Sequence, residues 1–302
     1  MPRFNIDFMG NRRIMFALSA ILLVISIGAL GIRGLKFGIE FEGGTAINVS
    51  NAGTVTETQI TKSFTDAGLS NVAVQATTVN GVGGFIVRSS ETSAVAANTM
   101  AKKAIESAGL AVGSYDVTTI GAGWGKNITN SAILALGLSI LAILLYVSLR
   151  FDYKMSVTAI LALVHDVIIT LGVYALFGRE VTPNTVAALL TILGFSLYDT
   201  IVVFHRIKEN SVGLVKQSFM SMANESINEV LVRSINTTLT ALIPLLVMLF
   251  FGGSTLKDFA FALTIGTVSG AYSSIGVAAP IYAIWKETEP KYKALAKKFA
   301  NA

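Results

Sequence analysis

The chain has 302 residues, of which 53% are hydrophobic and 14% charged, and its formal net charge is +5 at pH 7. Its apolar residues gather in blocks long enough to cross a bilayer, so the composition indicates a membrane protein rather than a soluble basic one. Cysteine is absent and histidine occurs twice. These counts exclude disulfides, thiolate metal sites, cysteine nucleophiles and a multi-histidine metal site.

Six apolar segments are predicted to cross the membrane as helices, because each has roughly the length that one span needs, about 20 residues. Their expected bounds are residues 14–32, 128–149, 156–177, 183–204, 234–251 and 259–285. The polar stretch at 209–232, between the fourth and fifth spans, is interpreted as an interfacial helix.

Positive charge is distributed unevenly between the two sides that these spans define. The richer side carries both chain ends and these residues: Arg12, Arg13, Arg150, Lys154, Arg206, Lys208, Lys286, Lys291, Lys293, Lys297 and Lys298. The turns at Arg179 and Lys257, on the other side, are poorer in charge. This asymmetry predicts an inner-membrane protein with both termini in the cytoplasm.

The prediction divides the chain into four parts. These are a cytoplasmic N-terminus with the first helix (1–36), an extracytoplasmic head (37–126), helices two to six (127–286) and a basic cytoplasmic tail (287–302).

The extracytoplasmic head is predicted to be a small α+β domain. Alternating apolar residues favour strands at 45–49, 72–77, 84–88 and 114–120, and glycine-terminated helices are expected at 56–68 and 92–109. An Asn-Gly-Val-Gly turn at 80–83 joins the two middle strands. The resulting β-α-β-β-α-β order is that of the ferredoxin-like fold.

The fourth span carries an aspartate, Asp199, within LGFSLYDTIVVFHRIKEN at 193–210. An ionised carboxylate at a helix centre costs about 3 kcal/mol in hydrocarbon, so such a residue is kept mostly where it has a task and a partner. Helix rise places Asp199 roughly 24 Å and Arg233 of the fifth span roughly 27 Å from the outer face. They are interpreted as an ion pair that a passing proton could break, with Asn236 and Thr237 adding hydrogen-bonding groups.

Other interpretations of these residues stay open at this point. Asp199 could be a structural acid bonded to a neighbouring helix, and Arg233 could be a boundary anchor that reaches the headgroups. His165 and Asp166, roughly 17–18 Å deep, suit either a proton relay or bonding between helices. The sixth span has a serine- and threonine-rich face, with Gly266 and Gly270 at GxxxG spacing. That pattern favours close helix packing over a pore.

The chain shows no GxxxxGK[ST] phosphate-binding loop. An intramembrane acid with a matched base and no ATP site indicates a protein driven by an ion gradient. No cofactor and no nucleic-acid partner are expected.

Several segments together resemble a known family. They are FGIEFEGGT at 37–45, SLRFDYK at 148–154, LALVHDVIITLGVYALFGRE at 161–180 and TVAALLTILGFSLYDTIVVFHRIKEN at 185–210. Over about residues 10–286 the chain is similar to the SecF branch of the SecD/SecF family, in the resistance-nodulation-division superfamily. Asp199 matches the family's fourth-helix aspartate on the proton path, and Arg233 matches the fifth-helix arginine that answers it. Tyr198 and His205 depart from the common pattern, in which Asn precedes the aspartate and Asp follows the Val-Val-Phe run.

The resemblance implies a proton-driven accessory to the Sec protein-export channel, whose head helps to pull or release an emerging polypeptide. The implied partners are a homologous six-span SecD-like subunit, the SecYEG channel, YajC and YidC as further candidates, unfolded exported polypeptides and membrane lipids.

Two other classes of membrane protein match the sequence less well. A half-size exporter of small molecules or lipids from the same superfamily would usually carry larger outside domains and about twice the spans. An intramembrane aspartyl protease needs a Gly-x-Gly-Asp setting, which neither Asp166 nor Asp199 has. The protein-export class fits best.

The orientation can be tested by cysteine labelling, since the natural chain has no cysteine. If the basic clusters set the topology, Asn80→Cys should react with an impermeant thiol reagent added outside intact cells, and Lys293→Cys should not. Labelling in the reverse sense would contradict the predicted orientation.

Overall fold

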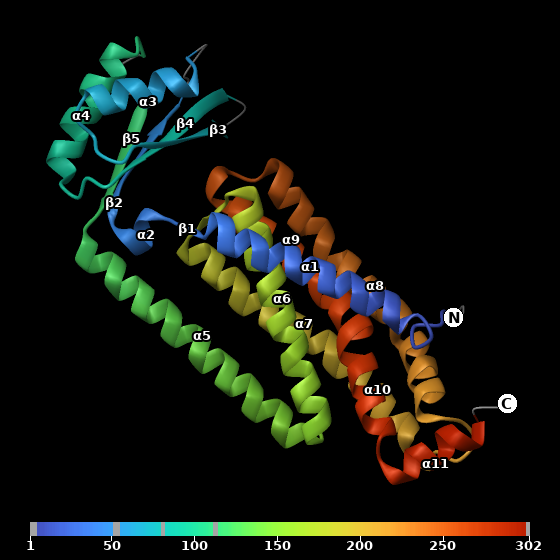
Figure 1. The fold of residues 1–302 in the computed structure, drawn as a ribbon. Helices are drawn as coiled ribbons and strands as arrows, with labels where there is room; N and C mark the ends of the chain where they lie inside the picture. Colours follow the sequence, from blue (N-terminus) through green and yellow to red (C-terminus); the bar gives the residue numbers. More distant parts are fainter. Residues whose placement is uncertain (1–4, 51–54, 80–81, 111–113, 300–302) are drawn as a thin grey trace.

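A computed structural model describes residues 5–50, 55–79, 82–110 and 114–299 of the chain. Its long helices form a bundle, and a small α/β head stands at one end of that bundle (Figure 1). Both chain ends lie at the opposite end. The two ends of the bundle are called the head end and the terminus end below.

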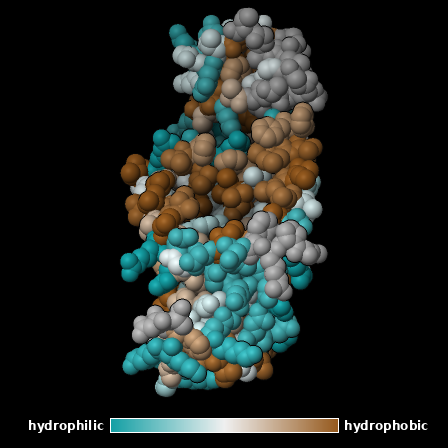
Figure 2. Space-filling view, turned by 90° about the vertical axis from the view of Figure 1, so that its right-hand side faces the viewer, coloured by the Kyte–Doolittle hydropathy of each residue, from teal (hydrophilic) through white to brown (hydrophobic). Residues whose placement is uncertain are grey.

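Within the described residues, six helices are long and apolar enough to cross a membrane. They are α1 (Arg12–Arg33), α5 (Ala122–Arg150), α6 (Tyr153–Phe177), α7 (Pro183–Ser211), α8 (Phe219–Phe251) and a sixth that runs from α9 (Ser254–Ser273) through the π turn η1 (Ser274–Ala278) into α10 (Ala279–Glu287). Figure 2 shows the corresponding hydrophobic band, with hydrophilic residues gathered below it. The six-helix prediction is confirmed.

Local sequence signals fix the ends of the two central helices. The Asp152 side chain accepts a hydrogen bond from the Met155 backbone N–H at 2.9 Å and so caps the start of α6. Gly178 ends the same helix with φ +61°, a left-handed conformation that glycine adopts without strain. Thr182 and Thr185 form a reciprocal capping box at the start of α7. These caps place α6 and α7 side by side with a short turn at the head end.

The head contains the six elements that the sequence predicts. In chain order they are β2 (Gly44–Val49), α3 (Glu57–Asp66), β3 (Ala73–Val79), β4 (Val82–Ser89), α4 (Ala94–Ser107) and β5 (Tyr115–Ile120). The strands pair antiparallel in the order β3-β4-β2-β5, which is the ferredoxin-like arrangement. Of the predicted turn at 80–83, residues 80–81 lie outside the described residues, and residues 82–83 belong to β4.

The head buries a hydrophobic core of its own between its sheet and its two helices. Ile47 and Val87 from the sheet and Phe64 and Ile105 from the helices are each fully buried in this core. Removing that apolar surface from water is the main stabilising contribution available to so small a unit.

Two short elements that the sequence analysis missed join the head to the bundle. Strand β1 (Lys36–Phe37) pairs in parallel with β6 (Glu180–Val181), which lies between α6 and α7. The helical turn α2 (Ile39–Glu42) then leads through Gly43 into β2. Gly44 has φ +126°, and a Cβ there would clash with the Ser89 carbonyl oxygen. Residue 44 therefore has to be glycine for β2 to lie against β4.

The interfacial helix predicted at 209–232 is wrong. Helix α7 continues to Ser211, and α8 begins at Phe219 as one continuous helix. The reason is that Phe219, Met222 and Ile227 recur at helical spacing and are buried inside the protein, not directed towards a membrane surface. The ring of Phe219 also packs 4.7 Å from that of Tyr292, in the tail helix α11 (Pro290–Phe299).

Because the head has a separate core, we expect residues 40–122 expressed alone to fold, with dispersed amide signals and a cooperative melt. Phe64→Ala should lower the free energy of unfolding by about 3–5 kcal/mol, a large part of the total stability of a small domain. Val95→Ala is the matched control, because Val95 is 79% exposed and its loss should change stability little. A random-coil spectrum of the unmutated fragment would contradict the expectation.

Candidate functional site

Asp199 lies between α7 and α8 and is 5% exposed. The hydroxyl of Ser234 in α8 lies 2.8 Å from Asp199 Oδ1 and 2.7 Å from Oδ2, so it can donate to either oxygen. A carboxylate has about four lone-pair positions to fill. Among the described residues, the Ser234 hydroxyl is the side chain that bonds this buried acid, so most of its lone-pair positions have no donor there.

Arg233 does not form the predicted ion pair with Asp199. Its guanidinium lies on the exposed surface of α8 and donates from Nη2 to the Tyr198 hydroxyl at 2.7 Å. The two residues nevertheless share a level, as predicted, because Tyr198 pairs with Arg233 and Asp199 with Ser234, one residue further along each helix. A helix turns by about 100° per residue, so adjacent residues point in different directions.

Among the described residues, neither Asn236 nor Thr237 forms a hydrogen bond with the Asp199 carboxylate. The Thr237 hydroxyl donates to the backbone carbonyl oxygens of Arg233 and Ser234, at 3.0 Å in each case. Asn236 is exposed, as is Thr240 one turn further along α8. We call Arg233, Asn236 and Thr240 the polar stripe. These residues share one helix face, and that face is open in the isolated chain.

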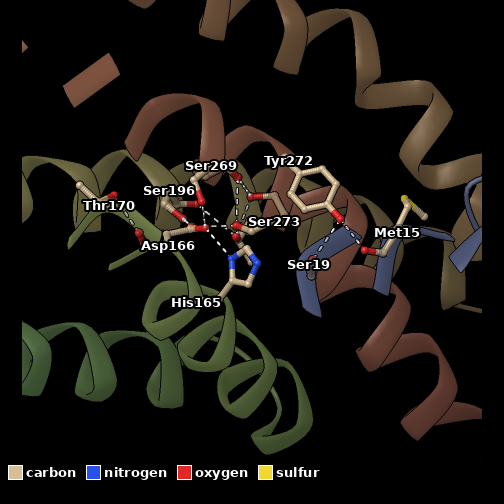
Figure 3. Close-up of polar contacts among 12 residues, drawn as sticks. Met15, Ser19, His165, Asp166, Thr170, Ser196, Ser269, Tyr272 and Ser273 are labelled. Carbon is tan, nitrogen blue, oxygen red and sulfur yellow. Dashed lines mark hydrogen bonds and ion pairs between the residues drawn. The ribbon is translucent and has the colours of Figure 1, made fainter. Parts of the chain in front are cut away.

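Asp166 in α6 has a much fuller set of hydrogen bonds than Asp199 (Figure 3). It is completely buried. Its donors are Ser196 of α7 at 2.6 Å, Ser269 and Ser273 of α9 at 2.7 Å each, and His165 Nδ1 at 3.0 Å. Donors from three helices converge on one carboxylate, so Asp166 bonds α6, α7 and α9 together. Of the two roles considered for Asp166, this geometry supports bonding between helices, and its role as a relay remains a prediction.

His165 shares this buried cluster but keeps one ring nitrogen unpaired. Its Nδ1 faces Asp166, whereas Nε2 is buried and has no hydrogen-bond partner among the described residues. The ring of Tyr272 lies 6.4 Å away, and its hydroxyl donates to the Met15 carbonyl oxygen at 2.6 Å and contacts Ser19 Oγ at 3.0 Å. Figure 3 shows Tyr272 reaching from the cluster towards α1.

Two polar residues of α7, Ser196 and Thr200, link the surroundings of Asp166 to the sixth span. Thr200, next to Asp199 in sequence, donates to the Ser196 carbonyl oxygen at 3.1 Å and contacts the Ser274 hydroxyl at 2.8 Å. Ser274 is the first residue of the π turn η1, a distortion that often occurs at functional sites. Hydrogen bonds therefore link Asp166 to Ser196, and Thr200 to Ser274 and the Ser196 carbonyl oxygen, and none of these bonds reaches the Asp199 carboxylate.

Helix α7 packs closely against α9 beside these hydrogen bonds. A Cβ on Gly266 would clash with the side chain of Ile192, and one on Gly270 would come within 2.8 Å of Ser196 Cβ. The GxxxG interpretation of the sixth span is confirmed.

The sequence analysis missed Ser234, Ser196 and Tyr272 as partners of these residues. A usable signal existed for the α9 donors, since Ser269 and Ser273 are four residues apart and so share a helix face. A lone serine such as Ser234 gives no comparable pattern.

Comparison with known proteins supplies the family. Residues 100–288 match the family model of the protein export membrane protein SecD/SecF C-terminal region, and residues 28–50 match the SecD/SecF GG motif. The SecF translocase subunit of Streptomyces coelicolor is 37% identical over 97% of this chain and 80% of its own length. The chain belongs to the SecD/SecF family. The SecF subunit of Petrotoga mobilis is 36% identical over 92% of this chain and 95% of its own length.

Solved structures of the family share the fold. The crystal structure of SecDF from Thermus thermophilus has a TM-score of 0.85 and 35% identity over 95% of this chain, which corresponds to 39% of the SecDF chain. SecDF in a super-membrane-facing form gives a TM-score of 0.70 at 33% identity, over 97% of this chain and 40% of that one. This family member is a multi-pass SecF translocase subunit of the protein-export system, and it spans about two-fifths of those SecDF chains.

The different hydrogen bonding of the two acids predicts different effects on stability. Asp166→Asn places an NH₂ group opposite hydroxyl donors, so we expect a cost of about 2–3 kcal/mol and a melting temperature several degrees lower in detergent. Asp199→Asn should leave the melting temperature nearly unchanged, because the Ser234 hydroxyl can reorient towards the amide oxygen. Equal losses in the two variants would contradict this distinction.

Proposed function

We propose that this SecF-family chain uses the proton-motive force to promote polypeptide export, and that Asp199 is the group that takes up and releases the proton. The observation that carries this is the buried Asp199 carboxylate, held by the hydroxyl of Ser234 between two membrane helices. An ionisable group kept at this depth is a functional candidate by default. Asp166, saturated with donors, has less freedom to exchange a proton.

Arg233 is the group that would answer a change of charge on Asp199. It is bonded to Tyr198, the chain neighbour of Asp199, so a rotation of its long side chain would bring the guanidinium to the carboxylate. A cation beside Asp199 favours the ionised acid, and its departure favours the bound proton. Exchange of Arg233 between Tyr198 and Asp199 is therefore the proposed proton switch.

A second membrane subunit would complete this site. Arg233 and the rest of the polar stripe are exposed on α8, and polar or charged side chains at membrane depth normally face other protein or a water-filled cavity, not lipid. The Thermus thermophilus relative is a SecDF protein in one chain, and the present chain matches 39% of its length. We infer that a separate SecD-like subunit covers the polar stripe.

The remaining parts of the proposal concern orientation and partners. The termini would lie in the cytoplasm and the head outside, where the head helps to pull or release an emerging polypeptide. Its support is the charge asymmetry of the sequence. The SecYEG channel is the proposed site of action, with YajC and YidC as further candidate partners.

The proton role is tested by export into inverted membrane vesicles with and without a proton gradient. Asp199→Asn and Arg233→Met should assemble at normal level but lose stimulation by the gradient. Asp199→Glu and Arg233→Lys should retain part of the stimulation, because each keeps its charge and changes its reach or shape.

Asp116→Asn is the matched control, since it makes the same substitution at an exposed position of the head and should leave stimulation intact. Full stimulation in Asp199→Asn at normal protein level would reduce Asp199 to a structural acid. Asp166 would then be the next candidate.

A further inference from the structure

The head and the membrane bundle are joined by an ion pair outside the membrane-spanning segments. Arg88 in β4 of the head lies 2.6 Å from Glu180 Oε1 in β6, the short strand between α6 and α7. The two side chains are 19% and 12% exposed, so water has little access to either. Arg88 also donates to Gln75 Oε1 at 3.2 Å, which fixes its position on the head sheet.

Glu180 is poorly satisfied as a charged group. Its second oxygen, Oε2, is buried and has no hydrogen-bond partner among the described residues, and an unpaired buried polar atom is costly, more so when it carries charge. The facing charged groups are Arg88, Lys36 opposite in β1, Glu40 in α2, and Asp258 in α9. Asp258 itself pairs with Arg179 at 2.6 Å. Two of the facing groups are acids, which further disfavour a charge on Glu180.

These surroundings change the proton affinity of Glu180. Burial raises the pKa of the Glu180 carboxyl to about 7, and the neighbouring Arg88 offsets only part of that effect. The negative charges of Asp258 and Glu40 raise the pKa and Lys36 lowers it. A buried ion pair whose desolvation cost exceeds its mutual attraction behaves in this way.

We propose that Glu180 is a proton-sensitive contact that holds the head on the bundle when it is protonated and loosens the head when it ionises. The junction is suited to this, because it is the contact between the head sheet and the turn that joins α6 to α7. Arg88 and Glu180 belong to different parts of the molecule, so separating them exposes both side chains to water.

The direction of the effect follows from proton linkage. In the closed arrangement the pKa of Glu180 is about 7, against the usual 4.5 for an exposed glutamate. Between these two values the closed state binds more protons than an open state in which Glu180 meets water. Acid therefore favours closure, by at most about tenfold per pH unit. This advantage is lost as the pH rises through the raised pKa.

The test is a distance measurement across the junction in the full-length protein. Spin labels are attached to Val95→Cys in the head and Gly253→Cys at the head end of the bundle, because both positions are exposed and the natural chain has no cysteine. Between about pH 5 and about pH 8.5, we expect the label distance to lengthen and broaden as the pH rises. A distance that does not change, or that lengthens on acidification, would overturn the proposal.

Variants separate Glu180 from other titrating groups. Glu180→Gln, a neutral isostere, should keep the short distance at every pH, whereas the matched control Glu57→Gln on the exposed surface of α3 should behave as wild type. Asp258→Asn should move the transition to lower pH, because it removes a charge that raises the pKa of Glu180. A pH response that persists in Glu180→Gln would refute the assignment.

The inference stands apart from the proposed proton switch at Asp199. Asp199→Asn should retain the full pH response of the head, since Asp199 lies within the membrane bundle and Glu180 at its head end. Loss of the response in Asp199→Asn would show that the head follows the membrane acid and not Glu180.

Discussion

The cost of keeping a charged carboxylate inside a membrane is the constraint on which the bundle depends. Asp166 meets that cost with donors from Ser196, Ser269, Ser273 and its neighbour His165, which belong to α6, α7 and α9. These bonds require the three helices to approach closely, and Gly266 and Gly270 supply the space. The buried carboxyl group of Asp166 and the small residues therefore support the same close packing of helices.

The contact between α7 and α8 is built differently. Here Asp199 is held by the hydroxyl of Ser234, and Arg233 faces outward to Tyr198. The molecule thus combines a firmly bonded centre with a lightly bonded acid at its edge, next to the open polar stripe. In the proposed function, a proton that binds Asp199 would change the contact between α7 and α8 and leave the bonds of Asp166 intact.

The sequence predicts well which residues of two helices share a level, and predicts less well in which direction around each helix they point. Rise per residue correctly placed residues 199 and 233 at one level, but the rotation of each helix, which made Ser234 the partner of Asp199, depends on packing that no local pattern records. The head was predictable because alternation and glycine stops are local signals. The β1–β6 pairing was not predictable from local signals, because each strand has only two residues and the strands are far apart in the sequence, at residues 36–37 and 180–181. The buried face of 209–232 was misassigned for the same reason, because its partners lie in α10 and α11.

The way the head is attached has a mechanical consequence. Strand β5 ends at Ile120 and α5 begins at Ala122, so a single residue, Gly121, separates the sheet from a membrane helix. On the entry side, Gly125 of α5 packs against the backbone of Phe41 and Gly43. Because this connection is so short, a tilt of α5 within the bilayer would carry the sheet with it, and the displacement would be largest at the edge of the head farthest from Gly121. The size of that displacement would depend on the distance from Gly121 to the far edge of the sheet.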